Sequence, residues 1–180
     1  MPKYVAFLRG INLGRRSIKM DALRKFLKAA GYENVLTLLA SGNVIFEKES
    51  KSLPKIKAAL EKQLKDEVGF DVPVILRSAK DIKALVASQP FNRIRVSKQN
   101  RLYVTFLLGP PKNIMKTPYK SGDGQLTILQ VTNSHIASVL EISSKSGTTD
   151  YMDFLGKEFG KGITTRNWNT VMKVYSLMQE

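Results

Sequence analysis

The sequence of 180 residues predicts an α+β protein. Its composition is that of a globular protein, with 43% hydrophobic and 24% charged residues. Short segments rich in β-branched and aromatic residues, which favour strands, alternate with segments whose apolar residues recur every three or four positions, as in helices. Glycine and polar residues separate these segments. A chain of this length forms one domain or two small ones.

The first half of the chain predicts the order strand, helix, strand, strand, helix, strand. Residues 3–9 form the first strand, and residues 20–30 have helical periodicity that Gly31 ends. Ser52 and Gly69 mark the start and the end of the second helix. The remaining strands are predicted at residues 35–39, 43–47 and 72–77. This order is that of the ferredoxin-like βαββαβ motif, in which right-handed crossovers place two helices on one face of four strands.

The second half also mixes strands and helices. Its elements are predicted at residues 101–108, 126–131, 136–142 and 151–159, followed by a last helix. That helix is amphipathic, because Trp168 and Val171 begin a helical repeat of apolar residues, and Thr164 or Thr165 is its expected N-cap. We place the boundary after Pro90, which gives subdomains 1–90 and 91–180.

Positive charge is the most unusual feature of the composition. The 29 Lys and Arg residues against 15 Asp and Glu give a formal net charge of +14, and both halves of the chain are basic. Residues 82–122 contain no carboxylate but include Lys98 and Arg101. A surface of this kind attracts polyanions such as nucleic acids. The alternative is that the charges only keep the protein in solution.

The residue types that the chain lacks exclude several kinds of site. The absence of cysteine excludes disulfides, thiolate nucleophiles and iron–sulfur clusters, and a single histidine, His135, excludes a histidine cluster. We therefore predict no metal site, the sequence leaves any cofactor unknown, and His135 is interpreted as a residue of a hairpin turn. No segment resembles a signal peptide or approaches the roughly 20 apolar residues of a membrane-spanning helix. We expect a cytoplasmic protein without a membrane partner.

Three strings in the sequence resemble a known family. They are YVAFLRGINLG at residues 4–14, SGNVIF at residues 41–46 and TRNWNTVMK at residues 165–173. Their order and separation resemble the mostly bacterial family catalogued as domain of unknown function 1697, over residues 2–175. The resemblance implies two ferredoxin-like subdomains packed together, and it implies no established activity.

The sequence departs from this family in one polar loop. Such proteins often carry a loop with Gly, Ser and Lys before the penultimate helix, whereas residues 142–147 here read ISSKSG. No role is therefore carried over to Lys145 or Ser146, and the role of the Ser143–Gly147 loop stays open.

The predicted topology brings two loops together at one end of the first sheet. The loop after the first strand and the turn between the second and third strands emerge at the same edge, because the first and second strands run in the same direction. Their N–H, amide and guanidinium groups suit a phosphate or a carboxylate. The alternative is that the glycines only allow tight turns and the asparagines bond the loop backbone. The candidate residues of this loop rim are Arg9, Gly10, Asn12, Arg15, Arg16, Ser41, Gly42 and Asn43.

A second candidate anion site is the start of the last helix. Backbone N–H groups and the positive end of the helix dipole are available there. Arg166, Asn167 and Asn169 lie in this predicted first turn, and Trp168 beside them is interpreted as a packing residue. The alternative for the polar residues is helix capping and hydrogen bonding between the subdomains.

Three functions remain open from the sequence. The first is binding of a phosphate-bearing ligand, either a nucleotide or a nucleic acid, at the loop rim. The second is a small-molecule enzyme that orients an anionic substrate without metal, cysteine or histidine-cluster chemistry. The third is a self-associating structural module. Whether the protein is an enzyme stays undecided.

Overall fold

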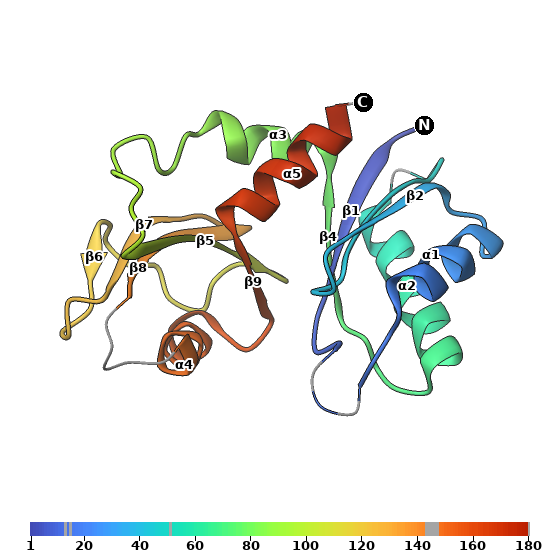
Figure 1. The fold of residues 1–180 in the computed structure, drawn as a ribbon, viewed down its shortest axis with the longest axis horizontal. Coiled ribbons are helices and arrows are strands. Elements are labelled where there is room, and N and C mark those ends of the chain that lie inside the picture. Colours follow the sequence, from blue (N-terminus) through green and yellow to red (C-terminus); the bar gives the residue numbers. More distant parts are fainter. Residues whose placement is uncertain (13, 15, 51, 143–147, 180) are drawn as a thin grey trace. The chain divides into compact units, whose positions relative to one another are not determined.

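The computed structural model describes residues 1–12, 14, 16–50, 52–142 and 148–179. Within these ranges the chain forms five helices and nine strands, which are arranged in two antiparallel sheets (Figure 1). The predicted α+β class is confirmed. The chain divides into two compact units, one made of Met1–Ala84 and Lys173–Glu180 and the other of Leu85–Met172.

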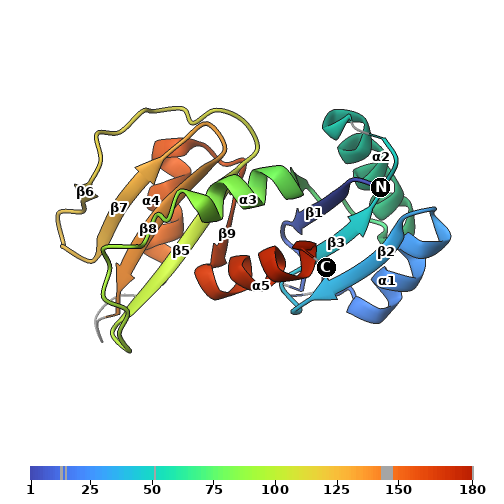
Figure 2. The same cartoon turned by 90° about the horizontal axis from the view of Figure 1, so that it is seen from above.

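The first unit is built on a four-stranded sheet. Its elements are β1 (Lys3–Leu8), α1 (Met20–Ala29), β2 (Glu33–Leu38), β3 (Asn43–Glu47), α2 (Leu53–Val68) and β4 (Val74–Ser78), followed by α3 (Ala79–Ala87), which continues into the second unit. The strand order is β2-β3-β1-β4, and every neighbouring pair is antiparallel. This order places β3 beside β1, as the predicted βαββαβ arrangement does. Helices α1 and α2 lie on the same side of the sheet (Figure 2).

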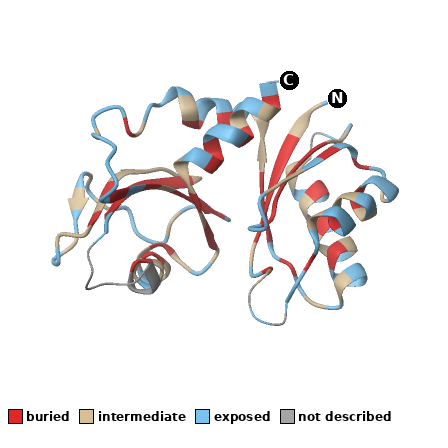
Figure 3. Ribbon diagram, in the orientation of Figure 1, coloured by how far each residue is buried: buried red, intermediate tan, exposed pale blue. Residues whose placement is uncertain are grey.

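Apolar residues fill both faces of this first sheet. On one face, Ala6, Leu8 and Phe46 pack in a cluster with Leu27 of α1 and Leu60 of α2. Successive residues of a strand point to opposite faces, and those that point away from the two helices are buried as well (Figure 3). These are Val5, Phe7, Ile45 and Ile75, each 2% exposed or less.

The ends of α1 and α2 follow the predicted signals with one exception. Gly31 follows α1 at φ +79° and Gly69 caps α2 at φ +78°, a backbone region that favours glycine. The exception is Ser52, which precedes α2 but makes no side-chain cap hydrogen bond. A carboxylate ties α2 to the sheet instead, because the backbone N–H of Val74 donates to Oε1 of Glu61 at 2.8 Å.

The second unit is built on a five-stranded sheet. Its further elements are β5 (Asn100–Leu107), β6 (Tyr119–Lys120), β7 (Leu126–Val131), β8 (His135–Glu141), α4 (Thr148–Phe159), β9 (Ile163–Asn167) and the first residues of α5 (Trp168–Gln179). The strand order is β6-β7-β8-β5-β9, with antiparallel pairing throughout. Leu155 and Phe159 of α4 pack with Leu107 and Ile136 of the sheet.

The connection between β5 and β7 lacks the helix that a ferredoxin-like unit has at this position. Residues 108–125 contain the short strand β6 as their regular element. Pro110, Pro111 and Pro118 fall in this segment. Proline lacks the backbone N–H and clashes with the preceding turn of a helix, so the composition of this segment disfavours a helix.

The start of the last helix also differs from the prediction. Ile163–Asn167 form strand β9, in which Thr164 pairs with Phe106 and Thr165 with Thr105. The prediction that either threonine caps the last helix is therefore wrong. The physical reason is that the β-branched residues of this segment fit a pleated strand paired with β5.

Candidate functional site

The two loops of the predicted rim lie side by side in the first unit. The backbone N–H of Leu8 donates to the carbonyl of Gly42 at 2.8 Å. Nδ2 of Asn12 donates to the carbonyl of Ala40 at 2.6 Å. The loop after β1 therefore touches the turn between β2 and β3, as the topology predicts.

Gly42 is required in this turn by the space around it. Its φ is +75°, and a Cβ built there would overlap Ile11 and lie 2.9 Å from Cβ of Leu8. The two loops can approach this closely only because residue 42 has no side chain. The structure gives Gly42 a packing role.

The side-chain amides of the rim form hydrogen bonds within the two loops. Oδ1 of Asn12 accepts the N–H of Ile18 at 2.8 Å, in addition to the bond that Nδ2 makes with Ala40. Asn43 is fully buried, and its Nδ2 donates to the carbonyl of Leu38 at 2.8 Å and to Oγ of Ser41 at 3.1 Å. These two asparagines therefore stabilise the turns, as in the alternative in which the asparagines bond the loop backbone.

The cations of the rim are placed differently from one another. Arg9 is half-buried, its backbone N–H donates to the carbonyl of Pro73, and burial lowers the pKa of its guanidinium. Arg16 is exposed, and its Cζ lies 5.5 Å from the centroid of the Phe70 ring, at the distance of a cation–π contact. Gly10 follows β1 at φ +65°. Arg15 lies outside the described residues.

Arg166 is buried in the second unit and does not belong to the first turn of a helix. It lies on β9 opposite Val104 and is 8% exposed. Its Nη1 donates to Oγ1 of Thr164 at 2.8 Å and to the carbonyl of Thr165 at 2.9 Å. Burial lowers the pKa of this guanidinium to about 10. The side chain thus stabilises its own strand.

Asn167 is the residue that caps α5. It stands immediately before the helix, and its Oδ1 accepts the N–H of Asn169 at 2.9 Å. This bond satisfies one of the backbone donors that a helix leaves without an intrahelical partner. Thr165, one of the two predicted caps, shares a hydrogen bond of 2.7 Å between its hydroxyl and that of Thr105.

An open cavity of about 710 Å³ lies where β5 begins and β9 passes into α5, within the second unit. Asn167 and Asn169 line it, as does Trp168, and two cations that the site prediction did not include, Lys98 and Arg101, line it as well. The full lining is Val96, Ser97, Lys98, Asn100, Arg101, Leu102, Asn167, Trp168 and Asn169, and it contains no carboxylate. The carboxylate-free stretch 82–122 contains this wall and is the sequence signal that could have identified it.

The wall that carries the two cations is held in place by its own hydrogen bonds. Asn100 is buried, its Oδ1 accepts the N–H of Ser97 at 3.0 Å, and its Nδ2 donates to the carbonyl of Arg95 at 3.0 Å. Nη1 of Arg101 donates to the carbonyls of Lys98 at 3.1 Å and Asn100 at 2.9 Å. These two bonds hold the guanidinium of the exposed Arg101 against the backbone of its own segment.

Trp168 forms the aromatic part of the cavity. Its ring is half-buried and meets the ring of Phe91 edge to face, with centroids 5.1 Å apart and an interplanar angle of 62°. This contact agrees with a packing role for part of the indole. The cavity lining shows that another part of it borders open space.

His135 begins β8 and is 9% exposed. Its Nδ1 lies 3.0 Å from Oγ of Ser134 and 3.1 Å from Oγ1 of Thr132.

In the part of the chain that the structure describes, no group of three or more His, Asp or Glu side chains could hold a metal ion. Across the same residues, no helix combines the length and the apolar character needed to cross a membrane. Lys145, Ser146 and the rest of the Ser143–Gly147 loop lie outside the described residues.

Comparison with known proteins identifies the family. The family model described as "Protein of unknown function (DUF1697)" matches residues 1–136. A solved structure, that of the conserved bacterial protein SP0830 from Streptococcus pneumoniae, is similar with a TM-score of 0.75 and 23% sequence identity, over 100% of this chain and 99% of that one. At this identity the likeness is one of fold. No curated protein matches the sequence. Because the family model covers 136 of the 180 residues, the chain belongs to the DUF1697 family of proteins of unknown function.

Proposed function

We propose that the protein binds a phosphate-bearing ligand in the cavity of the second unit. The observation that supports this proposal is the lining, which combines Lys98, Arg101, Asn167 and Asn169 and contains no carboxylate. Its volume of about 710 Å³ lies within the roughly 300–1,000 Å³ of small-molecule sites. Charged and amide donors around one hollow are the groups that recognise phosphate.

Each polar group of the lining has a distinct role in this proposal. A guanidinium has five N–H groups. The two on Nη1 of Arg101 hold the wall, and in this proposal those on Nε and Nη2 bind the ligand. Lys98 supplies a mobile point charge. The amide of Asn169 and the positive end of the α5 dipole add to the attraction for an anion. Trp168 offers an apolar surface for the part of the ligand that carries the phosphate.

The loop rim of the first unit is the weaker site by the same criteria. Asn12 and Asn43 donate to loop carbonyls, and Gly42 is needed for packing. Arg16 is exposed but lies over the ring of Phe70. We therefore place the ligand in the second unit.

A single-stranded nucleic acid is the second candidate ligand. Arg93 and Arg95 are exposed and belong to the same carboxylate-free stretch as Lys98 and Arg101. A chain of phosphates would engage these additional cations, whereas a single nucleotide would engage the cavity alone. The two ligands differ in salt dependence, which is steep when several phosphates are neutralised.

The test uses the fluorescence of Trp168, the only tryptophan in the chain. Adenosine 5′-monophosphate, pyrophosphate and a single-stranded oligonucleotide are titrated separately, with calorimetry as a second readout. We expect saturable binding, and we expect Lys98→Gln with Arg101→Gln to weaken it about tenfold or more, since hydrogen bonds to charged groups contribute roughly 1.5–3 kcal/mol.

The matched control is Lys112→Gln with Lys116→Gln. Both lysines are exposed in the second unit, and the double change removes the same charge without touching the cavity lining. An equal loss of affinity in the two double variants would show that only the net charge matters. No saturable binding of any of the three probes would reject the proposed function.

A further inference from the structure

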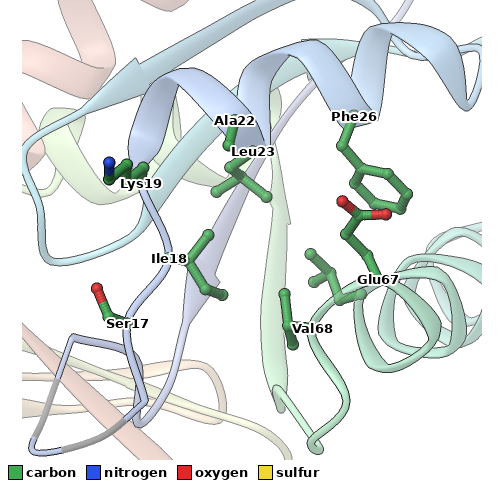
Figure 4. A pocket seen from close by; sticks show the side chains of 9 residues that line it. Ser17, Ile18, Lys19, Ala22, Leu23, Phe26, Glu67 and Val68 are labelled. Carbon is green, nitrogen blue, oxygen red and sulfur yellow. The ribbon is translucent and has the colours of Figure 1, made fainter.

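A second cavity, of about 260 Å³, lies between α1 and α2 in the first unit (Figure 4). Its floor is formed by Ile18, Leu23 and Leu64, which are buried side chains. Phe26 and Val68 are half-buried and form its walls. The cavity is therefore suited to a small apolar body, and it is far smaller than the cavity of the second unit.

One end of this cavity favours positive charge. Glu67 lines it, and Figure 4 shows the Glu67 carboxylate pointing toward the side chain of Phe26. The face of an aromatic ring attracts a cation, most strongly when the cation is also removed from water. A carboxylate and an aromatic ring at the mouth of an apolar hollow are the combination that recognises an organic ammonium ion.

The end of α2 adds to this preference. The helix ends at Val68 with Gly69 as its cap, so the carbonyls of its last turn carry the negative end of the helix dipole at this place. Lys65 in the same turn lies 3.0 Å from Oδ1 of Asp71, so an exposed ion pair offsets its charge. Glu67 is thus the charged side chain that lines the cavity at this end, beside the negative end of the α2 dipole.

The opposite end of the cavity carries a lysine. Lys19 lines the cavity and precedes the first residue of α1, and its side-chain nitrogen points away from Leu23 and Glu67 (Figure 4). An ammonium group would accordingly be repelled from the Lys19 end and drawn to the Glu67 end. The charged side chains therefore differ between the two ends of the cavity, whereas the residues of its floor are apolar.

We propose that this cavity binds a small organic ammonium ion with a branched apolar body, with the ammonium beside Glu67 and Phe26 and the apolar body on Leu23 and Leu64. This site is independent of the anion site proposed for the second unit. The probe is 3-methylbutylammonium, compared with two molecules of nearly the same shape, the neutral 3-methylbutanol and the anionic 3-methylbutanoate.

Calorimetry and amide NMR shifts on the full chain test the charge preference. We expect the ammonium to bind about five to ten times more tightly than the alcohol and the carboxylate to bind most weakly. Glu67→Gln should weaken ammonium binding about fivefold, and Lys19→Gln should strengthen it. Asp66→Asn is the matched control, because Asp66 is exposed on the same helix, carries the same charge and does not line the cavity.

A cavity-filling variant makes the test independent of charge. Ala22 is exposed on α1 and lines the cavity, so Ala22→Leu should abolish binding of the ammonium while leaving the helix intact. The proposal is overturned if the alcohol binds as tightly as the ammonium, if Glu67→Gln and Asp66→Asn have the same effect, or if the ammonium does not bind. None of these outcomes bears on whether the second unit binds phosphate-bearing probes, so the two proposals are tested independently.

Discussion

Gly42 shows how a single residue determines the shape of a loop pair. Its carbonyl accepts the N–H of Leu8, and the space where a Cβ would stand is taken by Ile11 and Leu8. A side chain at this position is disfavoured twice, once by the left-handed backbone and once by the neighbouring atoms.

Gly42→Ala is therefore expected to lower the free energy of unfolding by about 2–5 kcal/mol, the sum of roughly 1–2 kcal/mol for the left-handed backbone and 1–3 kcal/mol for overpacking. Gly14→Ala is the control, because Gly14 has a φ of +59° but no atom within 4 Å of an added Cβ. That control should cost only about 1–2 kcal/mol. Urea unfolding of both variants measures the difference, and equal losses would show that crowding at Gly42 is unimportant.

Tyr151 belongs to a buried cluster of hydroxyl groups in the second unit. Its hydroxyl lies 3.0 Å from Oγ of Ser138 and 3.5 Å from Oγ1 of Thr105, and its ring stacks on that of Tyr103 at 5.6 Å between centroids. Burial, the largest cause, raises the pKa of Tyr151 above the ordinary 10.0. The neutral phenol is consequently the form that the fold accepts.

This shift predicts a loss of stability in alkali. Because the folded pKa of Tyr151 is raised, its contribution is complete below the unfolded pKa of 10.0 and is lost as the pH rises from there through the folded pKa, where the unfolded chain binds fewer protons than the native one. Tyr151→Phe should cost about 1 kcal/mol at pH near 8 through its lost hydrogen bonds. Its free energy of unfolding should then fall less steeply with pH than that of the unaltered protein. Urea unfolding at a series of pH values measures both slopes, and identical slopes would contradict the assignment.

At the level of helices and strands, local signals predicted the elements that end at special backbone positions. Gly31 and Gly69 stop α1 and α2 because few other residues adopt a positive φ readily. Such local signals did not predict strand β9. Its residues Ile163–Asn167 precede a strongly amphipathic helix, and what makes them a strand is their pairing with β5, some 60 residues earlier. The β-branched residues of the segment suit a strand, but a pairing partner at that distance cannot be read from the local sequence.

The candidate sites, like the helices and strands, could be predicted from the sequence only in part. The meeting of the two rim loops follows from the order of strands. The engagement of Asn12 and Asn43 does not, because it depends on where the carbonyls of Ala40 and Leu38 point in a turn that contains Leu39 at φ +61°. Predicting the cavity of the second unit would have required the register of β5 and β9, in which Tyr103 lies opposite Asn167. Without that register, the wall containing Lys98 and Arg101 could not be joined to Asn167 and Asn169.

At the level of the whole molecule, one helix contributes to both compact units. The residues of α5 up to Met172 group with the second unit, and those from Lys173 on group with the first. A boundary after Pro90 assigns all of α5 to the second subdomain, so the two divisions of the chain differ in this helix. Val174 and Met178 are buried in the part that groups with the first unit.

The end of α5 is thus expected to stabilise the first unit, although more than 80 residues of the second unit separate the two parts in sequence. Met178 is 5% exposed and Met172 on the same helix is 36% exposed, which allows the same substitution to be compared at both. Met178→Ala should lower the free energy of unfolding by about 2–4 kcal/mol, because it leaves a cavity in a packed region. Met172→Ala should change it by no more than about 0.5 kcal/mol. Hydrogen exchange locates the effect: Met178→Ala should speed exchange of the buried amides of β1, and faster exchange confined to β5 and β8 would place the end of α5 with the second unit instead.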